Sequence, residues 1–158
     1  MYGKVVELGD KLESGLAKYA VHLEVEPDIG AIGIGAIGIG PITGSISRAW
    51  VEYGGVEVSE VPEGENFVVK ASFTASNPGF SIKPWDPGWS TAITAISTDG
   101  KVKGGDPTNQ YAAYQSEVAS VSLGPMPAND ITLRVKLWGN QDMWTSPGVP
   151  DLPPQADW

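Results

Sequence analysis

Apolar and polar residues alternate along much of the chain from residue 48 onward, which is the pattern of half-buried β-strands. Residues typical of turns separate these stretches, most clearly the pair Asp99 and Gly100, a common hairpin turn. About seven strands are predicted, over residues 48–53, 56–61, 66–76, 91–98, 101–103, 117–123 and 130–138. This spacing indicates a mainly β fold in which residues 48–140 form a single antiparallel β-sandwich of two sheets.

The same alternation predicts which side chains of the sandwich point inward. On a strand every second residue faces the same side of the sheet, so the apolar members of each alternating run form the core. The expected inward set is Phe67, Val69, Ala71, Phe73, Ile93, Ala95, Ala119, Val121, Leu123, Ile131, Leu133, Val135 and Leu137.

A different periodicity precedes the β-rich part. Between residues 4 and 24, apolar residues recur at spacings of three and four, which predicts an amphipathic helix within residues 1–28. The apolar face of this helix consists of Val5, Leu8, Leu12, Leu16, Tyr19 and Leu23, and Pro27 ends it. So long an apolar face needs a partner, because an isolated helix is marginal in water. That partner is either the β-domain of the same chain or a neighbouring copy.

Residues 29–47 form a Gly/Ile-rich segment with the tandem repeat AIGIG at 31–35 and 36–40. Its nineteen residues carry no charge and include seven isoleucines and six glycines, a composition too apolar for a solvated linker. As a strand it requires a bulge near Gly35 and Ala36, and as a helix it brings small residues onto one ridge. Insertion into a membrane is a less favoured interpretation, because Pro41 and the glycines suit a spanning helix poorly. We expect burial between subunits.

Residues 141–158 contain four prolines and no basic residue, and they are predicted to form an extended arm. The formal charge of the whole chain is −9, and no basic stripe is present to neutralise phosphates. Nucleic acid is therefore not an expected partner. Cysteine is absent, so disulfides and thiolate chemistry are excluded. The first 28 residues lack the apolar run of a secretory signal peptide.

Catalytic motifs are not evident. The one histidine, His22, has no recognisable nucleophile motif to serve. A cluster of glutamates around the turn at 62–65 lacks the residue order of a calcium loop and is interpreted as a solvated edge. We therefore expect no catalytic residue, no metal site and no cofactor.

Two stretches of the β-rich part, VPEGENFVVKASFTASNPG and LGPMPANDITLRVKLWG, resemble an immunoglobulin-like β-sandwich of the CARDB or adhesion type. Such domains enter a strand through Pro-x-Gly-x-x-hydrophobic, which Pro62, Gly64 and Phe67 match. They leave it through Asn-x-Gly, matched by Asn77 and Gly79. The resemblance extends over residues 56–139, without the cysteine pair of a true immunoglobulin domain. It implies a scaffolding or binding module of the kind found in cell-surface proteins and virus particles.

These patterns lead to one principal prediction, a non-enzymatic structural subunit of a virus particle or surface filament. Its expected partners are copies of itself and other structural proteins of the same particle, which places it in a virion or an extracellular assembly. The assembly residues are predicted to be Leu8, Leu12, Leu16, Ile29, Ile32, Ile34, Ile37, Ile39 and Ile42.

Aromatic residues carry the alternative prediction, a carbohydrate-binding module. Exposed tryptophans and tyrosines on a β-sandwich can stack on sugar rings, and here they fall in two predicted loops. The candidate sugar-binding residues are Trp85, Trp89, Tyr111 and Tyr114. The competing interpretation places the tryptophans in the core or at an interface between subunits.

Overall fold

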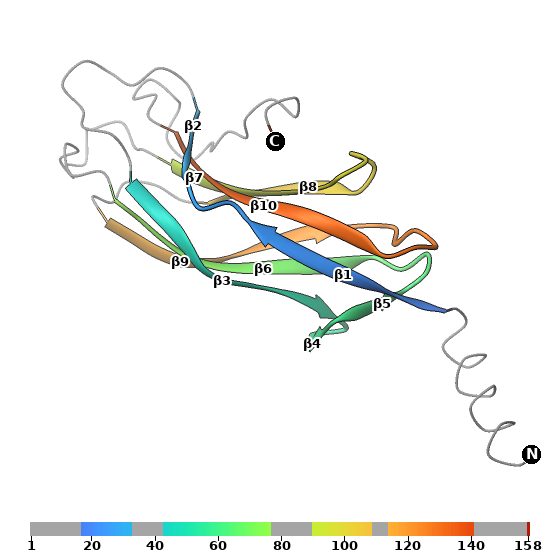
Figure 1. The fold of residues 1–158 in the computed structure, drawn as a ribbon. Coiled ribbons are helices and arrows are strands. Elements are labelled where there is room, and N and C mark those ends of the chain that lie inside the picture. Colours follow the sequence, from blue (N-terminus) through green and yellow to red (C-terminus); the bar gives the residue numbers. More distant parts are fainter. Residues whose placement is uncertain (1–16, 33–42, 77–89, 109–113, 141–157) are drawn as a thin grey trace, which may run out of the picture.

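The computed structural model describes residues 17–32, 43–76, 90–108, 114–140 and 158, and every regular element in these ranges is a β-strand. Ten strands follow one another along the chain (Figure 1). They are β1 (Lys18–Val25), β2 (Gly30–Ile32), β3 (Thr43–Tyr53), β4 (Val56–Val58), β5 (Glu60–Pro62), β6 (Phe67–Ser76), β7 (Ser90–Ser97), β8 (Lys103–Thr108), β9 (Tyr114–Leu123) and β10 (Ile131–Asn140).

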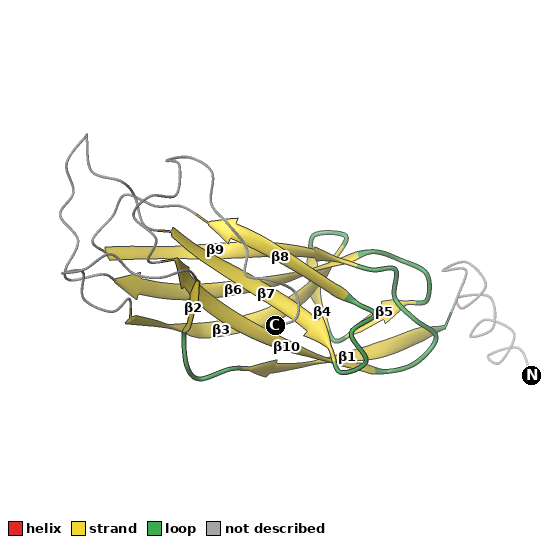
Figure 2. Ribbon diagram, turned by 90° about the horizontal axis from the view of Figure 1, so that it is seen from above, coloured by secondary structure: helices red, strands yellow, loops and turns green. Residues whose placement is uncertain are grey.

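The strands form two sheets packed face to face (Figures 1 and 2). Sheet 1 has the order β5-β1-β10-β7-β8, with the short β2 also paired to β10, and sheet 2 has the order β4-β3-β6-β9. Most neighbours are antiparallel, but β1 and β2 both run parallel to β10. The predicted mainly β sandwich is therefore confirmed, with the added feature that its first and last long strands pair in parallel.

The core lies between the inner faces of the two sheets. Every side chain of the predicted inward set is buried, which confirms the alternation argument for each of the strands concerned. Val51 of β3 and Val61 of β5 are buried with them, as is Met126 from the connection between β9 and β10. Removing these apolar side chains from water is the principal stabilising term of such a fold.

The predicted helix over residues 4–24 is wrong for the part that the structure describes. Residues 18–25 form strand β1, which pairs with β10 on one side and β5 on the other. In this strand Val21 and Leu23 are the register partners of Ile131 and Leu133 in the core. The apolar residues therefore alternate with polar ones, as in a strand with one buried face. Tyr19 and Leu23 fit both periods because they are four residues apart. Residues 1–16 lie outside the described part of the chain.

On both long sides of the sandwich, the edge strands of the two sheets are connected to each other. On one side β4 pairs with β3 while β5, two residues later, pairs with β1. On the other side, the Asp106 carboxylate of β8 accepts a 2.9 Å hydrogen bond from the backbone N–H of Ser120 in β9. Gly104 lies so close to β9 that a Cβ there would stand 2.5 Å from the carbonyl oxygen of Ser122. These contacts limit the pairing of the edge strands with other chains.

The two ends of the sandwich differ in how the strands are connected. At one end, which we call the turn end, short connections join β3 to β4, β5 to β6, β7 to β8 and β9 to β10. At the other, the distal end, the chain leaves the described strands for residues 33–42, 77–89, 109–113 and 141–157 (Figure 2). The register of the strands fixes this arrangement. Asn140 is paired with both Ile32 and Ser90, and Ser76 with both Thr43 and Tyr114.

Candidate functional site

The structure places only some of the predicted site residues. Ile29 is partly buried against the core, Ile32 ends β2 opposite Asn140, and Tyr114 begins β9 opposite Ser76. The remaining candidates lie outside the described residues: Leu8, Leu12, Leu16, Ile34, Ile37, Ile39, Ile42, Trp85, Trp89 and Tyr111. The bulge expected near residues 35–36 lies outside them as well.

Although most of these candidates are not described, the strand termini that flank them meet at the distal end. The Gly/Ile-rich segment begins at β2 and returns at β3, and the residues between β6 and β7 carry Trp85 and Trp89. The five residues preceding β9 include Tyr111, and β6 and β9 are neighbours in sheet 2. The assembly isoleucines and the sugar-binding aromatic residues were predicted to form separate sites, whereas the strands that flank both sets end at the same end of the sandwich.

The Gly/Ile-rich segment is attached to the sandwich on both sides of its repeat. Ile29 precedes β2 and Ile46 lies in β3, and both pack against the core. Between Ile46 and Arg48 the register of β3 shifts, and the Ser47 hydroxyl donates a 3.0 Å hydrogen bond to the carbonyl of Ser72. Residues 43–47, assigned from the sequence to the Gly/Ile-rich segment, therefore belong to the sandwich.

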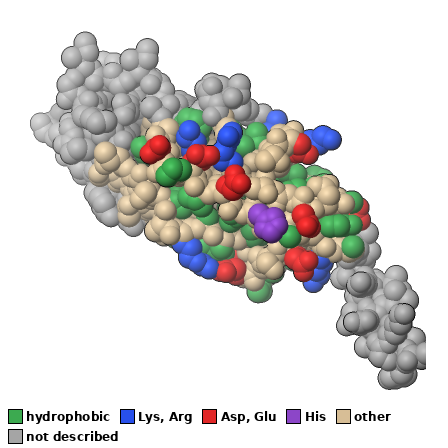
Figure 3. Space-filling view, viewed as in Figure 1, with side chains coloured by type: hydrophobic (Ala, Val, Ile, Leu, Met, Phe, Trp, Pro, Cys, Tyr) green, Lys and Arg blue, Asp and Glu red, His purple; other side chains and the backbone are tan. Residues whose placement is uncertain are grey.

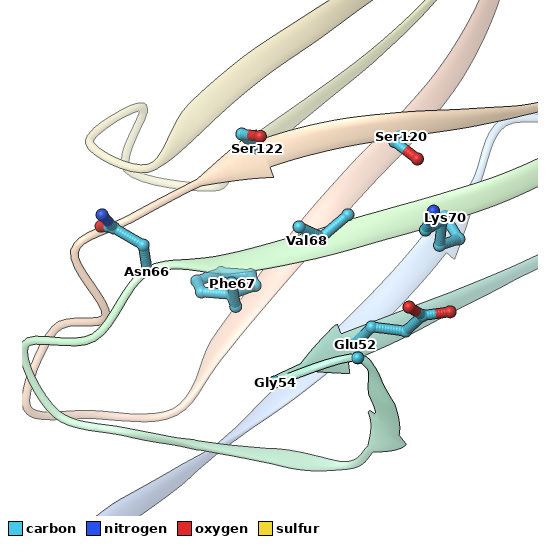
Figure 4. Close-up of a pocket in the computed structure, with 9 residues that line it drawn as sticks. Glu52, Gly54, Asn66, Phe67, Val68, Lys70, Ser120 and Ser122 are labelled. Atoms are coloured by element: carbon cyan, nitrogen blue, oxygen red, sulfur yellow. The ribbon is translucent and has the colours of Figure 1, made fainter.

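The outer face of sheet 2 contains a shallow pocket of about 320 Å³ near the turn end (Figure 4). Its lining combines a carboxylate, an ammonium group, an amide, two hydroxyls and a few apolar atoms, a set suited to a neutral polar ligand. The lining residues are Glu52, Gly54, Gly55, Asn66, Phe67, Val68, Lys70, Ser120 and Ser122. Phe67 belongs to the core and contributes little exposed surface.

The indole of Trp50 and the charged side chains around it border this pocket on the same face. The guanidinium of Arg48 lies 4.4 Å from the ring centroid of Trp50 and is paired with the carboxylate of Glu57. The Trp50 Nε1–H donates a 2.7 Å hydrogen bond to Glu52, which holds this carboxylate at the pocket rim. In the register of the sheet, Trp50 lies directly opposite Lys70. These interactions fix the orientation of the indole on an otherwise polar surface.

The outer face of sheet 1 carries a second apolar cluster, separate from the core. Trp138 of β10 and Ala92 of β7 are buried there beneath Trp158, which is 5% exposed, and Ile96 is partly buried beside them. The Trp138 Nε1–H donates a 2.8 Å hydrogen bond to the hydroxyl of Thr94, itself only 1% exposed. The sequence analysis missed this cluster. Its signal was Trp138 itself, because alternation places this large apolar side chain on the outer face.

Arg134 connects the cluster to a more polar part of the same face. Its guanidinium donates a hydrogen bond to the main-chain oxygen of Trp158 and lies 3.8 Å from the Glu26 carboxylate. A pocket of about 370 Å³ lies beside Arg134, lined by Glu24, Ile96, Ser97, Thr98, Asp99, Gly100 and Arg134. Across the visible surface, acidic and basic side chains are interspersed, with no extended field of one sign among the described residues (Figure 3).

Asp99 is a titratable group in the turn between β7 and β8. The Ser97 hydroxyl donates a 2.6 Å hydrogen bond to Asp99, and the backbone N–H of Lys101 donates another of 3.0 Å to the same oxygen. These bonds, led by that of Ser97, lower the pKa of Asp99. The arrangement is that of a turn stabilised by its carboxylate. His22 is exposed on β1.

Two further features of the described residues concern metals and membranes. No group of three or more His, Cys, Asp or Glu side chains among these residues is arranged to hold a metal ion. Within the same ranges, no helix has the length and apolar character needed to cross a membrane.

Comparison with known proteins does not extend these observations: no family model, curated protein or solved structure matches the chain. The resemblance to immunoglobulin-like sandwiches of the CARDB or adhesion type therefore stays a prediction. The class that the fold itself defines is a mainly β, two-sheet sandwich.

Proposed function

We propose that the protein is a non-enzymatic structural subunit of a homo-oligomeric assembly, a virus particle or a surface filament. In this proposal the sandwich is an immunoglobulin-like scaffold, and the Gly/Ile-rich segment lies between neighbouring copies. The observation that carries the proposal is the place of that segment. It is fixed to the core at Ile29 and Ile46, and both flanking strands end at the distal end.

The physical argument concerns the isoleucines between these two attachment points. Residues 33–42 include Ile34, Ile37, Ile39 and Ile42 and carry no charge. Burying each of these side chains against a neighbour contributes about 1.5–3 kcal/mol of transfer free energy. The glycines between them allow backbones to approach closely. Association costs translational and rotational entropy, which several buried isoleucines per subunit can offset. If each copy contributes the same isoleucines to the contact, the resulting assembly is symmetric.

The test is the mass of the full-length protein by light scattering in detergent-free buffer. We expect a large discrete or filamentous species for the native sequence. The variant Ile34→Asn/Ile37→Asn/Ile39→Asn is expected to be a monomer that keeps the β-sheet signal in circular dichroism, because in this proposal these residues pack between copies and not within the sandwich. The matched control is Val56→Asn/Val118→Asn, which changes two valines that are 63% and 55% exposed on the sandwich.

Two results contradict the proposal. The first is a native protein that is monomeric at all accessible concentrations. The second is a triple variant that assembles as well as the control, because the Gly/Ile-rich segment then contributes nothing to association. Loss of assembly in the valine control places the interface on the sandwich surface and contradicts the proposal in the same way.

A second candidate function, carbohydrate binding, is favoured by the neighbourhood of β6 and β9. The residues that carry Trp85 and Trp89 follow β6, those that carry Tyr111 precede β9, and Ser76 and Tyr114 are register partners. Aromatic side chains from both segments therefore start from adjacent strands, an arrangement that suits stacking on a sugar chain.

This candidate is tested by retention of the protein in affinity electrophoresis on immobilised polysaccharides. Trp85→Ala/Trp89→Ala is expected to abolish retention while leaving assembly unchanged. Trp50→Ala is the matched control, because it removes an indole from the outer face of sheet 2, away from the distal end. Equal retention of all three proteins, or no retention of any, contradicts carbohydrate binding by this loop.

A further inference from the structure

The outer face of sheet 1 is built around a buried tryptophan pair rather than a polar surface. Trp138 is 4% exposed and Trp158 is 5% exposed, although both lie outside the core. Ala92, the register partner of Trp138, is fully buried beneath them and leaves room for the second indole. We call the surface formed by Ala92 and Trp138 the receptor, and Trp158, which covers it, the anchor.

Polar contacts orient both members of the pair. Thr94 accepts the hydrogen bond of the Trp138 indole at 2.8 Å, which fixes the ring of the receptor. Lys136 places its ammonium group 4.5 Å from the centroid of the same ring. Arg134 then donates to the main-chain oxygen of Trp158, so the anchor is recognised by its backbone as well as by its indole. Apolar contact and a charge-assisted hydrogen bond together give specificity for this residue.

Strand β2 forms one wall of this receptor. A Cβ at Gly30 would stand 2.4 Å from a ring carbon of Trp138, so only glycine allows β2 to lie this close to the indole. Gly30 is also the first residue of the strand that leads into the Gly/Ile-rich segment. The Trp158 site, defined as Ala92, Ile96, Arg134 and Trp138, is thus connected directly to the segment assigned to assembly.

We infer that the Trp158 site is an inter-subunit receptor, and that in the assembly it binds Trp158 of a neighbouring copy. This inference rests on the proposed function. Residues 141–157 separate Trp158 from the end of β10, so the same anchor can reach its own site or a neighbour's with identical contacts. In a particle, the high local concentration of neighbouring copies favours exchange between chains.

The charges of residues 141–158 and of the Trp158 site also support a neighbouring copy as the partner. The arm of residues 141–158 carries three aspartates, Asp142, Asp151 and Asp157, and no basic residue. The receptor offers Arg134 and Lys136 beside the tryptophan pair. Copies of a chain with a net charge of −9 repel one another, and contact between this acidic arm and Arg134 or Lys136 offsets part of that repulsion, reduced by Glu26, whose carboxylate lies 3.8 Å from Arg134.

The first experiment tests whether the site is a receptor. A fluorescent peptide of residues 150–158 is titrated into the full-length Trp158→Ala variant, in which the site is empty, and binding is followed by anisotropy. We expect saturable binding that weakens at least tenfold when the peptide carries alanine in place of tryptophan. Arg134→Gln in the protein is expected to weaken binding several-fold. Lys101→Gln, an exposed charge in the β7–β8 turn, is the control and leaves binding unchanged.

The second experiment asks which chain supplies the anchor. The protein has no native cysteine, so Thr98→Cys, at the rim of the pocket beside Arg134, and Gln155→Cys, near the anchor in the sequence, introduce a unique pair for a flexible bis-maleimide cross-linker. Docking between chains gives dimers and higher ladders on a denaturing gel, whereas docking within a chain gives cross-linked monomers only. Mixing the two single variants, one of them tagged, is expected to yield the tagged–untagged pair.

The outcomes separate this inference from the proposed function. Absence of saturable peptide binding overturns the receptor. Cross-linked monomers alone, in a sample that light scattering shows to be assembled, overturn the exchange between chains while the proposed function stands. A full-length protein that is monomeric in the absence of cross-linker overturns both the assembly and the inter-subunit anchor. Ladders that depend on Arg134 support the inference.

Discussion

The turn end and the distal end of the sandwich show how differently one chain treats its two sets of strand connections. All of the glycines with positive φ in the described residues lie at or next to the turn end, at Gly54, Gly55, Gly64, Gly100 and Gly124. The distal end has no glycine of this kind among the described residues. It is instead the origin of residues 33–42, 77–89, 109–113 and 141–157.

Hydrogen bonds between turns make the turn end a single unit. The backbone N–H of Gly64 donates to the carbonyl of Met126 at 2.8 Å, and the N–H of Met126 donates to the carbonyl of Glu65 at 2.9 Å. The hairpin between β3 and β4 turns through Gly54 at φ 61° and Gly55 at φ 79°, a geometry that suits the twist of its strands. The turn end is therefore held by hydrogen bonds and glycine turns within the fold, and the distal end is where the proposed function places the contacts with other molecules.

The largest expected change in the free energy of unfolding comes from core substitutions, which compare the packing of the core near the turn end with its packing near the distal end. Phe67 lies opposite Leu123 near the turn end, and Phe73 lies opposite Ile46 toward the distal end. Because each is at most 3% exposed, Phe67→Ala and Phe73→Ala should each lower the free energy of unfolding by about 3–5 kcal/mol. Urea denaturation measures both. A loss at Phe73 below one third of that at Phe67 contradicts a continuous core.

The next effect concerns backbone geometry at the turn end. Gly124 has φ +131°, and a Cβ there would stand 2.8 Å from the Cα of Asn66, so Gly124→Ala combines strain with a clash. We expect a loss of about 1–3 kcal/mol in the free energy of unfolding. Gly54→Ala is the matched control, with φ +61° and open space around the added methyl, and costs about 1 kcal/mol. Assembly is expected to survive both changes, and its loss in either would contradict the division between the ends.

A smaller effect is expected at the distal end for Gly30→Ala. The added methyl would meet the Trp138 ring, so β2 must move away from β10. Only three residues of β2 are paired there, and the global cost is therefore about 1 kcal/mol. Hydrogen exchange should show faster opening at Trp138 and Asn140, with the turn end unchanged. Ala31→Gly adds no bulk and serves as the control, and equal exchange in the two variants would contradict the close contact at Gly30.

The smallest effect is the pH dependence contributed by Asp99. Its pKa is lowered in the folded protein, mainly by the hydrogen bond from Ser97, so the folded state favours the charged carboxylate. The stability that it contributes is complete above the unfolded pKa of about 3.9 and is lost as the pH falls through the lowered folded value. Asp99→Asn should therefore flatten the fall in melting temperature below pH 4 slightly. A variant curve parallel to that of the native protein would contradict this role.

How much of this fold follows from the sequence is clearest at β6 and β10. In both strands, alternation identified the inward side chains with the one exception of Ala75 in β6, because a strand between a core and solvent must follow a period of two. The turn at Gly54 and Gly55 was also predictable, because glycine adopts backbone angles that other residues avoid. The single strand predicted over residues 56–61 was wrong, because the chain divides there into β4 and β5, which pair in different sheets.

Strand β1 shows where local pattern is insufficient. The stretch KYAVHLEV alternates as well as any other strand, yet Tyr19 and Leu23 also extend a helical spacing that begins upstream. A segment this short satisfies both periods, and pairing with β10 and β5 decides between them. The available partner strands, not the residues of β1, therefore select its conformation.

The sequence by itself determined the mainly β class, most of the inward residues of the long strands and the apolar, uncharged character of the Gly/Ile-rich segment. Only the tertiary structure decided that the strand ends flanking this segment, the tryptophan-bearing residues and residues 141–157 meet at the distal end, because strand register is a long-range property. It alone also brought Ala92, Arg134, Trp138 and Trp158 together. Residues so far apart in the chain meet only when the sheets form, since each contributes one side chain to a surface that no local pattern encodes.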